Sequence, residues 1–292
     1  MRDVQAILDS PKLSRVRDQL DAMVRPAIYI ECARLNEDLP IGSSKFGGCP
    51  DLPSEFEWPT YQPSPTCERV AISLVAQIRL SDIAPFDVEN KLPHNGWLWF
   101  FSDQFGLYKH FSDDLEVYSD PRGTKVLYLP DESRVLSRAM PQGRMITERP
   151  WQPRSLAFKS HPTLPSLETS WIADAGSDEG VVKLDRSEWS SYADIHHEGL
   201  IGDRHHLLGY SDDVQPRQLE RGYRDFRNYL FASEPEPKTT EQWTQAFLKG
   251  RLLFEIESND DMNFGRWGCG SFFMRDEDMK ARRFDRVWFS EA

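Results

Sequence analysis

The segment from Ser44 to Pro59, which reads SKFGGCPDLPSEFEWP, constrains the fold more than any other part of the sequence. Its two adjacent glycines can adopt backbone angles that other residues avoid, and its three prolines fix φ and remove amide donors. Trp58 precedes the last proline, where the chain is biased toward extended geometry. The segment can therefore be neither a helix nor a central strand, and we expect a rigid loop of defined shape.

Composition limits the kind of protein that this chain can be. Of its 292 residues, 39% are hydrophobic and 12% aromatic, enough for a sizeable core in one large domain or two fused halves. The net charge of −12 disfavours nonspecific binding to nucleic acid or an anionic membrane, and it favours a basic partner. No apolar run reaches the roughly 20 residues of a membrane span, and the N-terminus lacks a signal-peptide core. We therefore expect a cytoplasmic protein.

The cysteines give no indication of a metal or redox centre. They stand at Cys32, Cys49, Cys67 and Cys269, and no two have the CxxC spacing of a zinc knuckle or a redox pair. A disulfide framework would be sparse for this length, so we expect free thiols in a reducing compartment.

Residues 1–26 are predicted to form an N-terminal helical segment. The Ser10-Pro11 pair is typical of a helix start, because serine caps the orphan amides and proline fits the first turn. Apolar residues then recur at three-to-four spacing over residues 13–24, and Pro26 ends the pattern. A short strand over residues 27–32 follows.

The rest of the chain, residues 27–292, is predicted to be one β-rich domain. Apolar, β-branched and aromatic runs predict strands at residues 70–80, 96–102, 125–129, 251–257 and 270–274. Residues 141–180 mix proline, glycine, serine and charge, and they are predicted to be an irregular connection. Helices are expected at residues 219–231 and after Thr239, whose spacing to Gln242 suits a capping box, with Gly250 ending the second helix.

Two parts of the chain share one layout, which suggests an internal duplication. LVAQIRL is followed by a loop and GWLWFF in the first part, and RLLFEIE by a loop and RWGCGSFFM in the second. We expect duplicated units at roughly residues 27–140 and 195–292, with an irregular acidic connection between them. Because strands run together and helices are segregated, the predicted class is α+β, with mixed or antiparallel sheets and a few peripheral helices.

The ordered motifs SKFGGCPDLP, EWP, VAQIRL, GWLWFF, HHLLGY and RLLFEIE…WGCGSFF resemble the YwqG-like family over most of residues 40–290. The resemblance implies an α+β fold built on a duplicated β-rich unit and brings no established catalytic residues. Members are encountered beside bacterial polymorphic toxins, where they look like immunity proteins. The chain departs from the family at Glu255, where glutamine is usual, and at residues 269–271, where Cys-Gly-Ser replaces Asp-Ala-Gly.

No motif in the sequence supports catalysis. GxSxG is absent, no cysteine has a nucleophile signature, and GSSKFGG lacks the order of a phosphate-binding loop. The acidic run at residues 259–261 lacks EF-hand spacing. His196 and His197, with His205 and His206, could offer one imidazole from each pair, which is two ligands short of a zinc site. We therefore expect no enzyme activity, no cofactor and no metal.

Acidic residues are concentrated in one segment. Residues 168–213 carry eleven carboxylates against three basic side chains, a net charge of −8, and a smaller acidic cluster lies at residues 113–116. Such charge can serve solubility alone, or it can form a docking face for a basic protein. The docking reading predicts the partner-binding residues Asp113, Asp114, Glu116, Asp174, Asp178, Glu179, Asp185, Glu188, Trp189 and Asp194.

Two functional hypotheses remain open from the sequence. In the first, the chain is an immunity protein that binds a cognate basic toxin, such as a nuclease, and occludes its active site. In the second, it binds a small ligand or is an enzyme, with a pocket between the duplicated halves lined by Gln77, His206 and Gln215. The identity of the toxin and the oligomeric state are not encoded in any pattern that we find.

Overall fold

The computed structural model describes residues 4–34, 39–63, 65, 68–103, 121–145, 147, 149–167, 169–177, 180–198, 205–211, 218–259, 262 and 268–291. Within these residues, every helix is too short or too polar to cross a membrane. The strands are β1 Arg25–Arg34, β2 Lys45–Phe46, β3 Asp51–Pro53, β4 Thr60–Tyr61, β5 Val70–Ala71, β6 Leu74–Arg79, β7 Trp97–Ser102, β8 Thr124–Leu129, β9 Leu136–Arg138, β10 Arg144–Met145, β11 Arg154–Thr163, β12 Ile172–Asp174, β13 Val182–Leu184, β14 His206–Leu208, β15 Gly250–Glu257, β16 Cys269–Arg275 and β17 Trp288–Glu291. The helices are α1 Val4–Leu8, α2 Arg17–Asp21, α3 Leu80–Ile83, α5 Arg186–Glu198, α6 Gln218–Leu230, α7 Thr240–Leu248 and α8 Asp276–Lys280, with 3₁₀ turns η1 Pro11–Leu13, η2 Ala84–Phe86 and η4 Pro121–Gly123.

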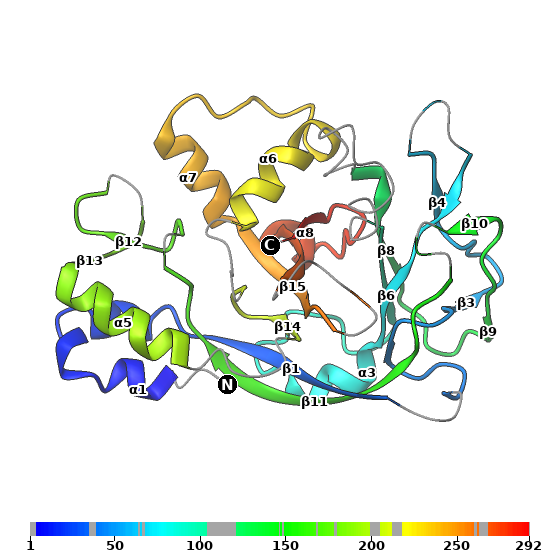
Figure 1. The fold of residues 1–292 in the computed structure, drawn as a ribbon, viewed down its shortest axis with the longest axis horizontal. Helices are drawn as coiled ribbons and strands as arrows, with labels where there is room; N and C mark the ends of the chain where they lie inside the picture. The colour runs from blue at the N-terminus through cyan, green and yellow to red at the C-terminus, as the bar shows by residue number, and fades with distance from the viewer. Residues whose placement is uncertain are drawn as a thin grey trace.

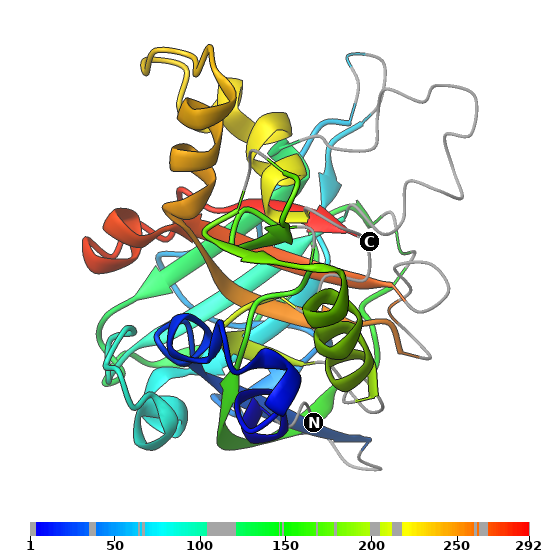
Figure 2. The same ribbon diagram turned by 90° about the vertical axis from the view of Figure 1, so that its left-hand side faces the viewer.

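Ten strands form one curled antiparallel sheet in the order β17-β16-β15-β14-β1-β11-β2-β6-β7-β8. The sheet is curled, as Figures 1 and 2 show, and aromatic side chains from strands near its two ends meet in the core. Phe100 on β7 lies 4.9 Å from Phe254 on β15 and 5.2 Å from Phe272 on β16, measured between ring centroids. Helices pack outside this sheet, so the α+β class expected from the sequence is confirmed.

The strand order is symmetric about the pair β1 and β11. We call β11, β2, β6, β7 and β8 the first half-sheet, and β1, β14, β15, β16 and β17 the second half-sheet. Each half-sheet has a register shift at the corresponding place, between Leu74 and Ala76 in one and between Leu252 and Phe254 in the other. Each of the two sequence layouts forms an adjacent antiparallel pair, β6 with β7 and β15 with β16. The half-sheets do not coincide with the expected units, because β1 lies at the start of the first expected unit yet pairs with β14 in the second half-sheet.

The largest difference from the sequence-based expectation is β11, which lies in the segment expected to be irregular. All ten of its residues pair with β1, from Thr163 opposite Arg25 to Arg154 opposite Arg34. Only its first two residues also pair with β2. Much of the strand is half-exposed or exposed, so it lacks the apolar run that marks a buried strand.

The N-terminal segment also differs from expectation. It is broken into α1, η1 and α2, and the Ser10 side chain makes no capping hydrogen bond. Pro26 lies within β1 rather than directly after a helix. The apolar stripe itself is buried as expected, with Leu13, Val16 and Leu20 in a core of their own.

The C-terminal helices follow their sequence signals more closely. Helix α6 occupies the range expected, and Thr239 accepts a 3.2 Å hydrogen bond from the Gln242 amide at the start of α7. Gly250 directly follows Lys249, the C-cap of α7, as expected, and it is also the first residue of β15. A side chain there would crowd Leu219 on α6, since a Cβ would lie 2.9 Å from its methyl groups.

Two lobes flank the sheet at opposite ends of the view in Figure 1. The acidic lobe, on the left, consists of α1, α2, β12, β13 and α5 and has its own apolar core. The second lobe, on the right, carries β3, β4, β5, β9 and β10 and packs on the outer aromatic side chains of β7. Helices α6 and α7 cover the outer face of the second half-sheet, where Tyr223 contacts Trp288.

Candidate functional site

Each half-sheet contains a short strand that ends in a left-handed turn. After β2, Gly47 and Gly48 have φ of 61° and 72°, and at the end of β14 Leu208 and Gly209 have 62° and 72°. The loop expected at Ser44–Pro59 contains this turn, and HHLLGY repeats it. The expectation that the segment holds no central strand is wrong at its start, because Lys45–Phe46 form β2 between β11 and β6 before the glycines and prolines are reached. Since leucine rarely adopts positive φ, the turn after β14 forms at a conformational cost.

In the first half-sheet this turn leads to a filled polar site, which we call the closed site. The Asp51 carboxylate is buried and accepts bonds from Lys45 Nζ at 2.9 Å, Arg138 Nε at 2.9 Å and Gln77 Nε2 at 3.0 Å. Gln77 Oε1 in turn accepts from the Asp51 amide and from Trp99 Nε1. Burial alone would raise the pKa of Asp51, but these hydrogen bonds together hold it below its usual value. The closed site is thus a structural cluster in which one buried carboxylate binds two cationic side chains.

The second half-sheet has a different polar site at the corresponding place. Glu255 on β15 is buried and accepts hydrogen bonds from the hydroxyls of Ser211 and Ser271. The His206 ring lies 3.0 Å from the Tyr210 carbonyl, which ties the turn to its own strand. Tyr210 and Ser211 then continue into the wall of a pocket.

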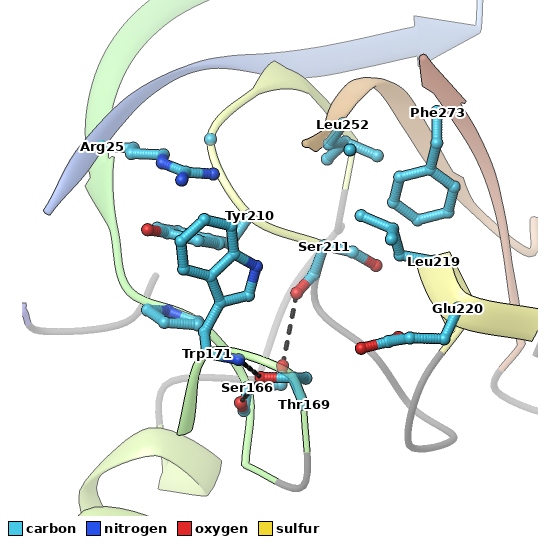
Figure 3. A pocket seen from close by; sticks show the side chains of 13 residues that line it. Arg25, Ser166, Thr169, Trp171, Tyr210, Ser211, Leu219, Glu220, Leu252 and Phe273 are labelled. Carbon is cyan, nitrogen blue, oxygen red and sulfur yellow. Dashed lines mark hydrogen bonds between the residues drawn. The ribbon is translucent and has the colours of Figure 1, made fainter. Parts of the chain in front are cut away.

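The pocket lies between the acidic lobe, the turn after β14, the start of α6 and the outer face of β15 and β16 (Figure 3). Its cavity volume is about 30 Å³. Leu219, Leu252 and Phe273 form an apolar wall, and Ser166, Thr169 and Ser211 supply hydroxyls on the other side. We call this pocket, with Arg25 and Glu220, the open site.

Arg25 enters the pocket from the first residue of β1. Its guanidinium carbon lies 4.3 Å from the centroid of the Trp171 ring and 4.1 Å from that of Tyr210, so both aromatic faces contact it. Burial lowers the pKa of Arg25 to about 10, and burial also raises that of the Tyr210 hydroxyl. Arg25 remains a cation at neutral pH: two aromatic faces contact it, and the negative charges of Glu89 and Asp276 raise its pKa without forming an ion pair with it.

Glu220 faces the same pocket from the first turn of α6. One carboxylate oxygen accepts hydrogen bonds from the Ser170 amide at 3.0 Å and the Ser170 hydroxyl at 2.8 Å. The other, Oε2, is buried and has no hydrogen-bond partner among the residues that the structure describes. The side chain is 5% exposed, and Figure 3 shows its carboxylate directed into the pocket.

The predicted docking residues fall into three groups. Asp174, Asp185 and Asp194 are exposed on the acidic lobe. Asp174 accepts from the Gly176 amide, and Asp185 caps α5 by accepting from the amides of Ser187 and Glu188. The remaining acidic residues lie outside the described part of the chain: Asp113, Asp114, Glu116, Asp178 and Glu179.

Glu188 and Trp189 have internal contacts. Glu188 is buried, accepts a 2.7 Å hydrogen bond from Arg15 Nε and also accepts from the Asp185 amide, which completes a capping box. Its hydrogen bond with Arg15 lowers the pKa of Glu188. Trp189 is half-buried against the core of the acidic lobe. The Glu188 carboxylate therefore holds the lobe together rather than presenting charge to a partner.

The described histidines and cysteines occupy structural positions. His196 stacks on Tyr192, with ring centroids 5.3 Å apart, and His205 Nδ1 accepts from the Glu257 amide. Cys32, Cys49 and Cys269 are free thiols. No group of three or more His, Cys, Asp or Glu side chains within the described ranges is arranged to hold a metal ion. The side chain of His197 and all of Cys67 lie outside those ranges.

The residues expected to line a ligand pocket do not form the one observed. Gln77 belongs to the closed site, and His206 bonds to the backbone behind the Tyr210 wall. Gln215 lies outside the described residues. The pocket adjoins the second half-sheet rather than the space between the halves. Of the residues that form it, Glu220 had a detectable signal: it lies three positions before Tyr223, on the buried stripe of an amphipathic helix.

The fold and the site define a single-chain α+β protein with a curled, pseudo-symmetric ten-stranded sheet and a small charged pocket on one half. Over residues 44–291 the sequence matches the family described as Domain of unknown function (DUF1963), and the chain belongs to that family. A comparison with curated proteins finds no match.

Proposed function

We propose that this protein acts by binding, as an immunity protein that neutralises a basic toxin by covering its active site. The resemblance to the YwqG-like family suggests this role. The observation that carries the proposal is the net negative charge of residues 168–213, which contain eleven carboxylates and three basic side chains. Such a surface attracts a cationic partner, and against a nuclease its carboxylates would occupy the places of substrate phosphates.

The acidic lobe is suited to present this charge. Asp174 and Asp194 are exposed, and neither forms an ion pair within the described part of the chain. The lobe has its own apolar core, so changes on its surface leave the curled sheet intact. Complementary charge can raise association rates from about 10⁵–10⁶ to about 10⁸–10⁹ M⁻¹s⁻¹ at low salt, which suits an inhibitor that must act before damage occurs.

Co-expression with the toxin encoded beside this gene tests the proposal. Cells that produce both proteins should survive, and the purified proteins should form a complex of defined stoichiometry. Continued killing at full expression of the intact chain would refute the immunity role.

Charge reversal then tests the surface. The variant Asp174→Lys/Asp194→Lys should slow association about tenfold or more at low salt, and less at high salt. The matched control Glu57→Lys/Glu68→Lys makes the same change at exposed sites on the second lobe and should preserve the rate. Equal effects of the two variants would assign the attraction to net charge rather than to the acidic lobe.

A further inference from the structure

We infer that the open site binds a small zwitterion of the α-amino acid type, with its carboxylate on Arg25 and its ammonium group on Glu220. The inference goes beyond toxin binding and does not depend on it. It rests on two opposite charges that face one small cavity without pairing, and on the chemistry of the walls between them.

The Glu220 carboxylate supplies the first charge. Ser170 engages only one of its oxygens, and the second is buried and directed into the cavity without a partner among the described residues. A buried carboxylate oxygen without a hydrogen bond is costly, whereas an ammonium donor would satisfy it with a charge-assisted bond. The site is therefore complete only when a donor occupies the cavity.

The Arg25 guanidinium supplies the second charge. The rings of Trp171 and Tyr210, which meet at 76°, both lie against it, and it makes no hydrogen bond or ion pair with any residue that the structure describes. The rings hold the guanidinium in place, and the N–H groups that point away from them are open to another acceptor. Arg251 lies 5.5 Å from the centroid of the Trp171 ring, and its charge is offset by Asp276, 3.7 Å away. A carboxylate is the group that a planar guanidinium binds in a bidentate manner.

The two charges do not neutralise each other. Figure 3 shows Arg25 and Glu220 entering the pocket from different sides, and the structure contains no ion pair between them. Water could fill the gap, but it would leave both charges in a partly buried setting without a counter-charge. A molecule that carries a negative and a positive group can bind Arg25 and Glu220 at the same time.

The size of the cavity limits the ligand. A volume of about 30 Å³ admits about two or three water molecules, which restricts the ligand to the smallest amino acids. Leu219, Leu252 and Phe273 offer an apolar surface for a methyl group, while the hydroxyls of Ser166 and Thr169 line the polar side. Alanine is therefore the probe that matches charge, size and wall.

Isothermal titration calorimetry on the intact purified chain tests the inference with three probes. L-alanine should bind saturably. N-acetyl-L-alanine lacks the ammonium group and L-alaninamide lacks the carboxylate, so each should bind about tenfold or more weakly. Absence of saturable L-alanine binding up to millimolar concentrations, or equal binding of all three probes, would overturn the assignment. This comparison uses only the unmodified protein and so does not depend on the folding of a variant.

Substitutions then locate the binding. Arg25→Met keeps an apolar stem between the aromatic rings, and Glu220→Gln keeps the acceptor that bonds to Ser170; each should weaken L-alanine binding about tenfold or more. Arg144→Met and Glu236→Gln make the same chemical changes at exposed positions away from the pocket and should preserve binding. L-alanine binding that survives both pocket substitutions would place the ligand elsewhere and refute the site.

Discussion

In the first half-sheet, Lys45 on β2 lies opposite Gln77 on β6; in the second, His206 on β14 lies opposite Glu255 on β15. The turn that follows each short strand has nearly identical φ values. The same backbone arrangement, a short strand followed by a left-handed turn, therefore occurs in both half-sheets. The side chains on it differ, and so do the charged groups that each site leaves without an ion pair.

In the closed site the charged groups pair with one another. Asp51 binds Lys45 and Arg138, both from its own half-sheet and lobe. The open site contains Arg25 and Glu220, which form no ion pair with any residue that the structure describes, and Glu255 with its two serines lies beside the turn. The comparison teaches that pairing stabilises the fold in one half, while the unpaired groups of the other half are available to a ligand.

The largest expected effect breaks the closed site. Asp51→Ala removes the partner of Lys45, which is 1% exposed, and leaves a buried ammonium group without a counter-charge. We expect a loss of about 3–5 kcal/mol in the free energy of unfolding, measured by urea denaturation. Arg134→Ala, which breaks the exposed pair with Glu55, is the control and should cost less than about 1 kcal/mol. A similar small loss in Asp51→Ala would mean that the cluster does not stabilise the fold.

A second contrast lies at the ends of β7 and β16. Here the charged group of the second half-sheet is paired, and that of the first half-sheet is not. Asp103 and Arg275 each lie three residues after the facing phenylalanines, Phe100 and Phe272. Arg275 is paired with Glu234, at 2.7 Å. The Asp103 oxygen Oδ2 is buried without a partner among the described residues, and burial raises the pKa of Asp103 to about 7.

This contrast predicts a pH dependence of stability. In the unfolded chain Asp103 titrates near its ordinary pKa of 3.8, so between that pH and about 7 the folded state holds more protons. The contribution of Asp103 to the free energy of unfolding is therefore complete below pH 4. It declines as the pH rises toward 7, by at most about 1.4 kcal/mol per pH unit. Glu291, whose pKa burial raises to about 7, adds to the slope with the same sign.

Asp103→Asn isolates the contribution of Asp103. The amide stays neutral at every pH, so the free energy of unfolding of the variant should decline less steeply as the pH rises. Between pH 5 and 8 this free energy should gain about 3 kcal/mol relative to the unmodified chain. Urea unfolding of both proteins at each pH measures the difference. Parallel curves for the two proteins would show that Asp103 is ionised at neutral pH in the folded state.

The sequence predicted the framework of both half-sheets better than either site. The runs that form β6, β7, β15 and β16 are long, apolar and aromatic, so their strand character follows from local pattern. Strand β11 was missed because its stability comes from pairing with β1 across 120 residues or more of chain, and its own residues are largely half-exposed. Local periodicity does not report pairing of this kind.

The open site was beyond local pattern for a similar reason. Its charged and aromatic groups come from segments far apart in the chain, and Arg25, Trp171 and Glu220 line one pocket only in the folded protein. Acidic residues also proved to have local roles that charge counting does not reveal. Asp185 and Glu188 form the capping box of α5, so part of the apparent docking charge is used within the lobe.

A smaller effect tests how tightly each turn is packed. Gly48 and Gly209 share a φ of 72°, so alanine is strained at both positions. A Cβ at Gly209 would lie 2.6 Å from Thr163 Oγ1, whereas at Gly48 its nearest neighbour, Pro153 Cβ, is at 3.1 Å. Gly209→Ala should therefore cost about 1–2 kcal/mol more than Gly48→Ala in urea unfolding. Equal costs would mean that backbone strain alone governs both turns.

The smallest effect examines the hydroxyls that hold Glu255. Ser271 Oγ donates to Glu255 Oε2 at 2.7 Å, and Ser211 donates to the same oxygen. Removing one hydroxyl, as Ser271→Ala or Ser211→Ala, should cost about 1 kcal/mol, because the other still serves the buried carboxylate. Removing both deprives that oxygen of two donors, so the double variant should cost more than the sum of the single variants in a double-mutant cycle. Additive costs would show that the hydroxyls act independently, and that the open site tolerates a second poorly satisfied carboxylate beside Glu220.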